Sequence, residues 1–484
     1  DVADLCEPLE IAGPGFINFR IKPAVLAAAA TAILEDPDTG LPVTEFPQRI
    51  VIDYSAPNVA KQMHVGHLRT TIIGDCFNRV LSSLGHTVIP QNHIGDWGTQ
   101  FGMLIEQVLH EGIDAGSLTL DEADALYKRA ATHFKEDEEF ATKARARVGL
   151  FQSGDETSLA IWQQLVDISK PAFNEAYQRL DVLLTDDHLA GESTYNDDLP
   201  VLVDELERSG VGVLDQGALC VFVDQFEAPL IVRKSDGGYG YATTDLAAIR
   251  RRVRDLEADR IIYVTDARQG DHFAQVFAAA RKAGFLPDDV MAEHVGYGMV
   301  LGQDGKPFKT RDGSAATLSS LLDAAEEEAA PNVALAAIKY ADLSNGLQKD
   351  YVFNAERMVQ TTGDTGPYLQ YAHARVNQIL RRADAESIGY GAVVELQEPA
   401  EQQLALLLTR FGEVVDDVAT ALTPHKLCNY LYDVAGALST FYEECPVLRS
   451  EGEVRSSRLA LCAATKAVLA KGLYLLGIDA PERM

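Results

Sequence analysis

Two histidines and a lysine form the group in this chain that is best suited to chemistry. His64 and His67 stand one helical turn apart, Lys61 lies three residues upstream, and all belong to the segment 55–67, SAPNVAKQMHVGH. Imidazoles donate hydrogen bonds to phosphate oxygens, and a lysine adds a compact positive charge. Gly66 between the histidines lets a nucleotide approach the backbone closely. The spacing therefore predicts a polyphosphate site.

The elements around this segment suit such a site. Residues 49–54, RIVIDY, predict a short buried strand, and residues 68–84 predict a helix that Gly85 ends. A strand, a loop and a helix N-terminus in that order form an anion site. Two alternatives stay open: a zinc site completed by His93 or Asp96, or two ordinary histidines of the core or the surface.

A second basic cluster lies in the loop 302–311, GQDGKPFKTR. Lys306 and Lys309 are three residues apart, and the hydroxyl of Thr310 follows the second lysine. A mobile loop that closes lysines over a polyphosphate has this composition. Any basic surface loop has it too, and the spacing alone does not separate the two interpretations.

Two further groups lie where predicted helices begin. Tyr241 and Asp245 are one helical turn apart, which would turn both toward one pocket, although a threonine cap would also explain that segment. Gln269 lies in the segment 264–272, which follows a predicted strand. In a doubly wound sheet, ligands bind at the carboxyl ends of the strands. A plain capped loop is the alternative for this segment.

The order of the elements predicts an α/β fold with a doubly wound parallel, Rossmann-like sheet. Predicted strands are 49–54, 87–91, 218–222, 229–232 and 260–264, and the helices among them are 68–84, 102–111 and 271–283. The acidic stretch from about 113 to 200 predicts a helical insertion. Beyond residue 334 we expect no strand but an all-α bundle, built from 334–344, 368–383, 399–421, 424–443 and 454–475.

Composition restricts the choice of partners. The chain of 484 residues has 42 Lys and Arg against 72 Asp and Glu, a formal net charge of −30, which argues against a broadly basic nucleic-acid surface. Local basic clusters exist at 250–254, 306–311 and 375–382, although each could be a solvated helix face. The six cysteines never form Cys-x-x-Cys and favour reduced cytosolic thiols. No apolar run is long enough to cross a bilayer.

Together these residues resemble the class I aminoacyl-tRNA synthetases, whose two signatures are His-Ile-Gly-His and Lys-Met-Ser-Lys-Ser. The first is present as residues 64–67, HVGH, and the second, degenerate, as residues 306–310, KPFKT. The resemblance is to arginyl-tRNA synthetases in particular. Further matching segments are 55–61 (SAPNVAK), 241–245 (YATTD), 340–344 (YADLS), 366–375 (GPYLQYAHAR) and 480–484 (APERM).

The resemblance implies roles for individual residues. His64, Gly66 and His67 would bind ATP and stabilise its α-phosphate. Lys309 would neutralise the leaving pyrophosphate, with Lys306 and Lys61 sharing that charge. The arginine substrate would be held through its α-amino group and its guanidinium by Asp53, Ser55, Asn58, Tyr241, Asp245 and Gln269. Pro307 and Phe308 stand where the general signature has methionine and serine.

Carboxylates suit a guanidinium for a physical reason. The guanidinium is planar, always charged and rich in donors, and each charge-assisted hydrogen bond to it contributes roughly 1.5–3 kcal/mol. The ammonium group of a lysine side chain cannot donate two parallel hydrogen bonds in the same plane. A site built to accept that pair of hydrogen bonds can select arginine over lysine by about 10⁴-fold without hydrolytic editing.

The resemblance implies an arginine–tRNA ligase that uses ATP with Mg²⁺ on its phosphates and no tightly bound protein metal. Arginine would attack the α-phosphate, and the terminal 2′-hydroxyl of the arginine tRNA would then attack the arginyl-adenylate, after tRNA binding. A cytoplasmic monomer with no membrane contact is expected. Candidate tRNA contacts are Asn18, Tyr430, Tyr432, Tyr442, Arg483 and Met484.

The resemblance also implies a division of the chain. Residues 1–47 would be the remnant of an N-terminal tRNA-contacting domain and its linker, which would make the chain truncated at its start. Residues 48–345 would form the catalytic domain, with the insertion at about 113–200 and the second-signature loop at 302–313. Residues 346–484 would form the helical anticodon-binding domain.

Three alternatives belong to different classes. A small nucleotidyltransferase shares His-x-Gly-His but has no use for a helical bundle of this size or a carboxylate pocket. A non-catalytic tRNA-binding paralogue is at odds with the retained Lys61, His64, His67, Lys309 and Asp245. Another class I synthetase remains possible if the pocket residues have other roles.

Overall fold

A four-stranded parallel sheet lies at the centre of the molecule. The computed structural model describes residues 2–308, 316–393 and 395–484. The strands run in the order β4-β3-β8-β9, with bounds β3 Arg49–Asp53, β4 Thr87–Gln91, β8 Arg260–Asp266 and β9 Met291–Tyr297. From β3 the chain crosses to β4 on one side, and from β8 it crosses to β9 on the other, so the direction of the connections reverses between β3 and β8. Ligands bind at such a switch point, beyond the carboxyl ends of the strands.

Both faces of this sheet are buried. Ile50 and Ile52 of β3 belong to one hydrophobic cluster, while Val51 belongs to the other. Alternate residues of a strand point to opposite faces, so apolar residues in succession are what a strand covered on both sides requires. Helix α2 (Val65–Ser83) packs on the first face, and α8 (Tyr241–Arg254) and α9 (Gly270–Lys282) contribute to the second cluster. The predicted doubly wound sheet is confirmed.

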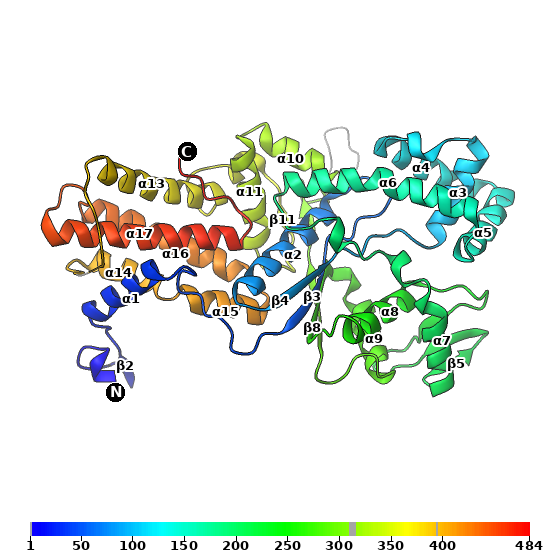
Figure 1. Cartoon of the computed structure of the whole chain (residues 1–484), viewed down its shortest axis with the longest axis horizontal. Coiled ribbons are helices and arrows are strands. Elements are labelled where there is room, and N and C mark those ends of the chain that lie inside the picture. Colours follow the sequence, from blue (N-terminus) through cyan, green and yellow to red (C-terminus); the bar gives the residue numbers. More distant parts are fainter. Residues whose placement is uncertain (1, 309–315, 394) are drawn as a thin grey trace.

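The predicted helical insertion is present, with three helices after α3 (Thr99–Glu111). They are α4 (Leu120–Glu136), α5 (Glu138–Gln152) and α6 (Glu156–Arg179). Side-chain caps start them: Thr119 caps α4, Asp137 caps α5 and Asp155 caps α6. Short 3-10 helices, Ala115–Ser117, Asp186–His188 and Glu192–Tyr195, connect these elements to the rest of the chain. Figure 1 shows the insertion at one end of the molecule.

The strands predicted at 218–222 and 229–232 do not join the central sheet. β6 (Ala218–Val221) pairs antiparallel with both β5 (Gly212–Asp215) and β7 (Leu230–Arg233). Helix α7 (Asp198–Ser209) packs against β5, and α8 packs against β7. In β7, Leu230 and Val232 are buried while Ile231 is half exposed, as expected when only one face of a sheet is covered.

The carboxyl-terminal part is helical, as predicted. Its helices are α10 (Leu318–Glu326), α11 (Pro331–Ser344), α12 (Ala355–Met358), α13 (Gly366–Ala385), α14 (Pro399–Leu408), α15 (Phe411–Ala421), α16 (His425–Glu444) and α17 (Gly452–Leu475). The segment 399–421 is two helices rather than one. The expectation of no strand beyond residue 334 is wrong, because β11 (Tyr351–Val352) pairs with β10 (Val300–Leu301). A backbone pairing of two residues leaves too little periodicity for detection.

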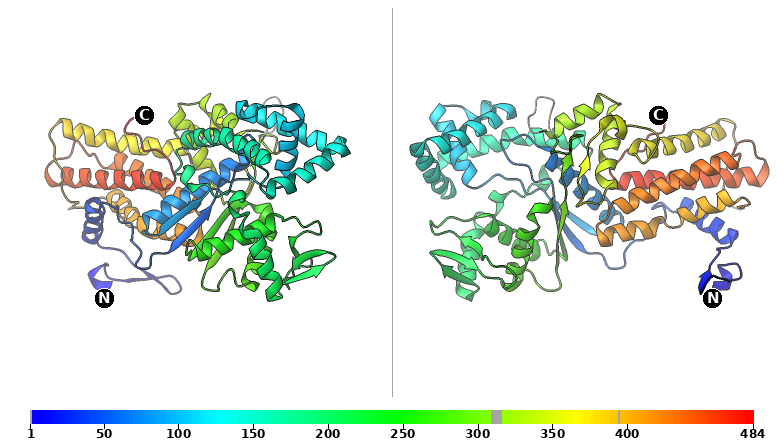
Figure 2. Two further views of the ribbon diagram at one scale, coloured as in Figure 1. Left: turned by 45° about the vertical axis from the view of Figure 1, so that its right-hand side comes forward. Right: turned by 180° about the vertical axis from the view of Figure 1, so that it is seen from behind.

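The amino-terminal residues lie beside the bundle. The 3-10 helix Val2–Asp4 precedes an antiparallel pair, β1 (Glu10–Ala12) and β2 (Phe16–Asn18), and helix α1 (Pro23–Glu35) follows. Helix α1 packs against α14 and α17, at the end of the molecule opposite the insertion (Figures 1 and 2). No helix in the described part of the chain is both long and apolar enough to cross a membrane.

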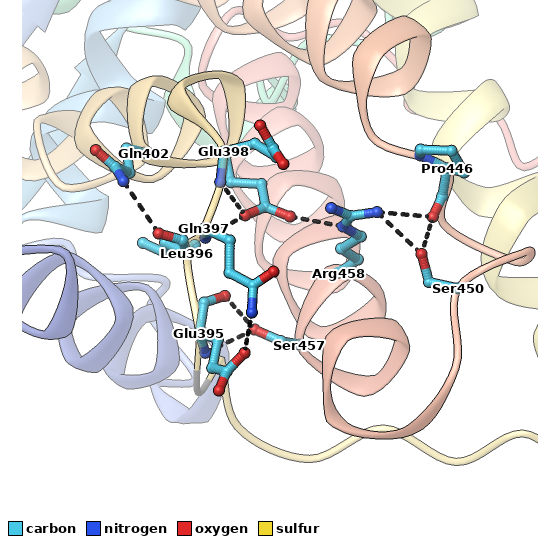
Figure 3. Close-up of polar contacts among 10 residues, drawn as sticks. Glu395, Leu396, Gln397, Glu398, Gln402, Pro446, Ser450, Ser457 and Arg458 are labelled. Atoms are coloured by element: carbon cyan, nitrogen blue, oxygen red, sulfur yellow. Dashed lines mark hydrogen bonds and ion pairs between the residues drawn. The ribbon is translucent and has the colours of Figure 1, made fainter.

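A buried ion pair fixes two loops to the bundle. Arg458 Nε lies 2.6 Å from one oxygen of Glu401, and the other oxygen accepts the backbone N–H groups of Gln397 and Glu398. Arg458 also donates to the carbonyl of Pro446, in the loop before α17 (Figure 3). Because both oxygens of Glu401 and both Nε and Nη1 of Arg458 have hydrogen-bond partners, the burial of this pair is tolerated.

Buried charges also join α2, which begins with the two histidines, to the carboxyl-terminal helices. Arg69 Nε lies 2.5 Å from Asp342 of α11, and both side chains are buried. Lys339 of the same helix donates to the carbonyl of Gly477, beyond α17. The position of α2 therefore depends on contacts made by the carboxyl-terminal bundle.

Candidate active site

A cavity of about 820 Å³ opens at the carboxyl ends of β3 and β8. It is bounded by the loop after β3, the first turn of α2, the first turns of α8 and α9, and the segment around β10. The predicted residues that line it are Asp53, Ser55, Asn58, His64, Gly66, His67, Tyr241, Asp245 and Gln269. These side chains come from four segments of the sequence and meet at the switch point of the sheet, as the sequence predicted.

The loop after β3 has a strained backbone that other elements hold in place. Ser55 and Ala56 have positive φ values of 74° and 48°, which cost free energy in non-glycine residues. The Ser55 backbone N–H donates to Thr70 Oγ1 at 3.1 Å, and the Ala56 N–H donates to Asn92 Oδ1 at 3.0 Å. Strain that is held by specific hydrogen bonds is typical of functional sites.

Helix α6 of the insertion supports the same loop. Ser55 Oγ lies 2.8 Å from the Tyr177 hydroxyl, and the Ala60 N–H donates to Ser169 Oγ at 2.9 Å. A third contact from α6 reaches the loop after β4, where Trp162 Nε1 donates to the Asp96 carbonyl at 2.6 Å. The insertion therefore supports two loops that lie beside the cavity.

His64 and His67 have fixed orientations and fixed protons. The Gly66 N–H donates to His64 Nδ1 at 3.0 Å, and the His64 N–H donates to His67 Nδ1 at 3.1 Å. Since Nδ1 of each ring accepts, a neutral ring carries its proton on Nε2. The rings stack with centroids 3.8 Å apart. A Cβ on Gly66 would lie only 2.8 Å from the His64 ring, so this position has room for glycine alone.

Both imidazoles are neutral at physiological pH. Burial, helped by the neighbouring His64 and Lys61, lowers the pKa of His67 to about 3. Burial also lowers the pKa of His64, with smaller contributions from Lys61 and Arg268. The two rings thus present uncharged Nε2–H donors over the whole physiological range.

Unlike His64 and His67, neither Lys61 nor Lys306 lines the cavity. Lys61 does not line the cavity, because its Nζ sits 3.7 Å above the ring of Tyr127 on α4, a cation–π contact. Lys306 is exposed, in the loop whose next two residues, Pro307 and Phe308, do line the cavity. Lys309 lies outside the described residues.

Two of the predicted arginine ligands already have partners within the chain. Asp245 Oδ2 lies 2.6 Å from His272 Nε2, and this hydrogen bond raises the pKa of His272. Asp53 Oδ2 lies 2.7 Å from Nη2 of Arg252, which is fully buried. Asp53 therefore faces a guanidinium of the protein itself, and its carboxylate is less available to a substrate than that of Asp245.

The sequence analysis missed Glu192, which lines the same cavity. Burial, followed by the negative charges of Asp96 and Asp245, raises the pKa of Glu192 to about 8. Two carboxylates that repel one another in a buried site favour a bound cation. The local sequence, Gly191-Glu192-Ser193-Thr194, carries no motif that would have revealed this role.

The geometry does not support the alternative zinc site completed by His93 or Asp96. Both carboxylate oxygens of Asp96 accept hydrogen bonds from Ser193, at 2.9 and 2.6 Å. The described residues contain no group of three His, Cys, Asp or Glu side chains that could hold a metal ion.

The predicted tRNA contacts come from different elements of the fold. Asn18 on β2, Tyr442 on α16 and Met484 are exposed. Tyr430 is buried, donates its hydroxyl to the Leu407 carbonyl at 2.9 Å and stacks on a phenylalanine. A base has no access to that ring, so the prediction is corrected: Tyr430 is a core residue.

Comparisons with known proteins show the family of the chain. The family described as "tRNA synthetases class I (R), catalytic domain" matches residues 30–333, and the "DALR anticodon binding domain" matches residues 369–484. The "Arginine--tRNA ligase" of Cutibacterium acnes is 66% identical over all of this chain and 89% of that protein.

Solved structures give the same result. The arginyl-tRNA synthetase of Plasmodium falciparum superposes with a TM-score of 0.83 at 28% identity, over 99% of this chain and 86% of that one. The arginyl-tRNA synthetase of Thermus thermophilus gives 0.82 at 26% identity, over 99% and 89%. The chain therefore belongs to the arginine–tRNA ligases, the class I aminoacyl-tRNA synthetases that activate arginine and attach it to tRNA.

Proposed function

We propose that the cavity between β3 and β8 is where arginine and ATP react. The observation that carries the proposal is the presence, in one cavity, of the carboxylates of Glu192 and Asp245 together with the neutral imidazoles of His64 and His67. The carboxylates suit a guanidinium, and the Nε2–H donors suit phosphate oxygens. The cavity can therefore hold a cationic amino acid beside a nucleotide.

The amino-acid end of the cavity is proposed to bind arginine as follows. Glu192 and Asp245 accept the guanidinium, and Tyr241 and Gln269 border that part of the cavity. Asn58 and the strained Ser55–Ala56 backbone hold the α-amino group. Asp53 acts mainly by fixing Arg252, so its role is indirect, which revises the expectation that it meets the substrate guanidinium.

The nucleotide end is proposed to bind ATP through the histidine pair. An oxygen of the arginine carboxylate attacks the α-phosphorus, the bond to the bridging oxygen breaks, and pyrophosphate leaves. His64 and His67 donate hydrogen bonds to oxygens on which charge develops, which is where preorganised donors accelerate a reaction most. Lys61, Lys306 and Lys309 neutralise the pyrophosphate. To reach the phosphates, Lys61 must leave its contact with the ring of Tyr127.

Mg²⁺ would travel with the ATP phosphates and supply further charge neutralisation. Mg²⁺ in nucleotide sites is bound mainly by substrate phosphates and water, with one or two carboxylates, and the carboxylates of Asp245 and Glu192 line the same cavity. The 2′-hydroxyl of the terminal tRNA adenosine then attacks the carbonyl carbon of the arginyl-adenylate, and AMP leaves.

The tRNA is proposed to contact the carboxyl-terminal bundle through exposed aromatic and basic residues. The guanidinium of Arg375 on α13 lies 4.1 Å from the ring of Tyr442 on α16, and unpaired bases stack on such surfaces. Asn18 and Met484 are further candidates. Local patches of this kind are needed in a chain with a net charge of −30.

The division of the chain into 1–47, 48–345 and 346–484 is also a proposal, as is a cytoplasmic monomer. All six cysteines are free and buried, which suits a reducing compartment. Light scattering of the purified protein tests the oligomeric state.

Pyrophosphate exchange with each amino acid, with and without tRNA, tests the proposed reaction. We expect exchange with arginine only, and only when arginine tRNA is present. Exchange driven by another amino acid would contradict the carboxylate pair as the guanidinium site. Exchange lost in Glu192→Gln at low arginine and restored at high arginine would support it.

A further inference from the structure

We propose that Asp96 is a positioning residue for arginine selection, because it and Trp97 hold Glu192 and Ser193 in a clasp that aims the Glu192 carboxylate into the cavity. The clasp consists of these four residues. The inference rests on the proposed contact between Glu192 and the substrate guanidinium, and its test separates a failure of that contact from a failure of the clasp.

Both carboxylate oxygens of Asp96 accept hydrogen bonds from Ser193. Its Oδ1 accepts the Ser193 backbone N–H at 2.9 Å, and its Oδ2 accepts the Ser193 hydroxyl at 2.6 Å. Asp96 is buried and is not among the residues that line the cavity. A buried carboxylate is costly unless it is hydrogen-bonded, so the two bonds hold Asp96 and the first turn of the short helix Glu192–Tyr195 in one arrangement.

The fit between the two segments is close. A Cβ on Gly191 would lie 2.6 Å from both carboxylate oxygens of Asp96, so any side chain at 191 would push the clasp apart. The backbone adds two further bonds: the Glu192 N–H donates to the Ile94 carbonyl at 3.1 Å, and the Ala190 N–H donates to the Asn92 carbonyl at 3.0 Å. The chain on either side of Glu192 is thus fixed to the segment that extends β4.

The clasp is reciprocal. While the Asp96 side chain holds Ser193, the backbone amide of Trp97 interacts with the Glu192 carboxylate and favours its ionised form. Two adjacent residues of one loop therefore act on Glu192: Asp96 fixes the chain beside it through Ser193, and Trp97 favours the ionised form of its carboxyl group, which burial and the negative charges of Asp96 and Asp245 oppose. The orientation of a carboxylate decides whether it can receive the planar fork of a guanidinium.

The insertion holds the clasp from outside. Trp162 on α6 donates its indole N–H to the Asp96 carbonyl at 2.6 Å, and its ring lies 5.9 Å from that of Trp97 in an edge-to-face arrangement. These are the only two tryptophans of the chain. Intrinsic tryptophan fluorescence consequently reports on the clasp and on its contact with α6, without any label.

Steady-state aminoacylation of the full chain with arginine tRNA tests the clasp. The variants are Asp96→Asn, Ser193→Ala and Glu192→Gln, with Ser209→Ala as the matched control. Ser209 is an exposed serine at the end of α7, and its hydroxyl bonds only its own helix. We expect the KM for arginine to rise about tenfold or more in the first three variants, as expected when a bond to a charged group is lost. The KM for ATP stays unchanged in all four.

Fluorescence supplies a readout that a purely structural role would not move. In the unaltered chain, titration with arginine in the presence of tRNA should change tryptophan emission in a saturable way. The half-saturation point should shift upward about tenfold in Ser193→Ala and stay in place in Ser209→Ala. Trp162→Phe keeps the packing on Trp97 but removes the donor to Asp96, and it should shift the half-saturation point in the same direction.

The outcomes separate the two hypotheses. If Glu192→Gln leaves the arginine KM unchanged, the proposed guanidinium contact is wrong. If Glu192→Gln raises the KM but Ser193→Ala and Asp96→Asn do not, the contact stands and the clasp is refuted. Equal rises in the KM values for arginine and ATP, together with a lower Tm, would show that Asp96 only stabilises the fold.

Discussion

His272 Nε2 lies 2.6 Å from Asp245 Oδ2, so one oxygen of the proposed guanidinium ligand is held by a neighbouring imidazole. The other oxygen receives no hydrogen bond from the residues that the structure describes. One half of the carboxylate is therefore fixed, while the other half is available to a ligand in the cavity that Asp245 lines.

This pairing predicts that His272 orients Asp245. We expect His272→Ala to raise the KM for arginine about fivefold to tenfold, because an unheld carboxylate rotates. His272→Gln keeps an N–H donor and should stay close to the unaltered enzyme. Steady-state KM values for arginine and ATP check this, and equal effects of both substitutions would show that charge rather than orientation matters.

Asp245→Asn should weaken arginine binding far more than ATP binding. Loss of a charge-assisted hydrogen bond costs roughly 1.5–3 kcal/mol, which corresponds to about a 10- to 100-fold rise in the arginine KM. Asp433→Asn, at an exposed position on α16, serves as the control. Equal losses for both substrates would argue against Asp245 as a guanidinium ligand.

Arginine binding should release a proton near neutral pH. Because the pKa of Glu192 is raised to about 8, the carboxyl group is mostly protonated at pH 7, and a bound guanidinium favours its ionised form. Arginine affinity should thus increase as the pH rises from 7 to 9. Calorimetry in two buffers with different ionisation enthalpies measures the proton release, which should vanish in Glu192→Gln.

The raised pKa of Glu192 should also make the folded protein less stable as the pH rises, whereas it makes arginine binding stronger. A carboxyl group with a raised pKa stabilises the fold while protonated, and that contribution is lost as the pH rises through its folded-state value. The Tm should therefore fall as the pH rises from about 4.5 toward about 8 and level off above it, and the fall should be smaller in Glu192→Gln. A pH-independent Tm difference between the two proteins would contradict this.

His67→Asn should lower kcat with little change in the arginine KM. Removing one preorganised donor to developing charge costs about 10²- to 10³-fold in kcat. Because burial and nearby positive groups lower the pKa of His67 to about 3, protonation of this residue should produce no step in kcat between pH 5 and 8. An acid limb in that window that disappears in His67→Asn would overturn this.

The Asp53–Arg252 pair should be mainly structural. Arg252→Met leaves a buried carboxylate unpaired and should destabilise the chain by about 3–5 kcal/mol. Adding Asp53→Asn should recover much of the loss, because no buried charge then remains. Thermal unfolding of the single and double variants measures the coupling, and purely additive losses would contradict it.

The sequence predicted the central sheet well, for a physical reason. Strands buried on both faces show uninterrupted apolar runs such as 49–54, and those runs need no tertiary information. The predicted start of α2, at residue 68, was less accurate. The helix begins at Val65, because the side chain of His64 caps it. Histidine is not among the usual capping residues, so propensity gave no signal.

Other features could not be predicted from local sequence. The break between α14 and α15 falls at Thr409–Arg410, where neither glycine nor proline marks it. Glu192 and Asp245 are far apart in the chain, and only the fold brings their negative charges together. The pairing of Asp53 with Arg252 likewise depends on the packing of α8 against the sheet.

Helix α6 sets the spacing between the loops that lie beside the cavity. Its contacts at Trp162, Ser169 and Tyr177 are seven and eight residues apart, close to two turns each, so they share one face and span about 22 Å. Single substitutions would disturb one loop at a time. Deleting one residue between Trp162 and Ser169 would instead rotate the two ends by about 100° relative to each other, and the amino-acid and nucleotide ends of the cavity would lose their common spacing together.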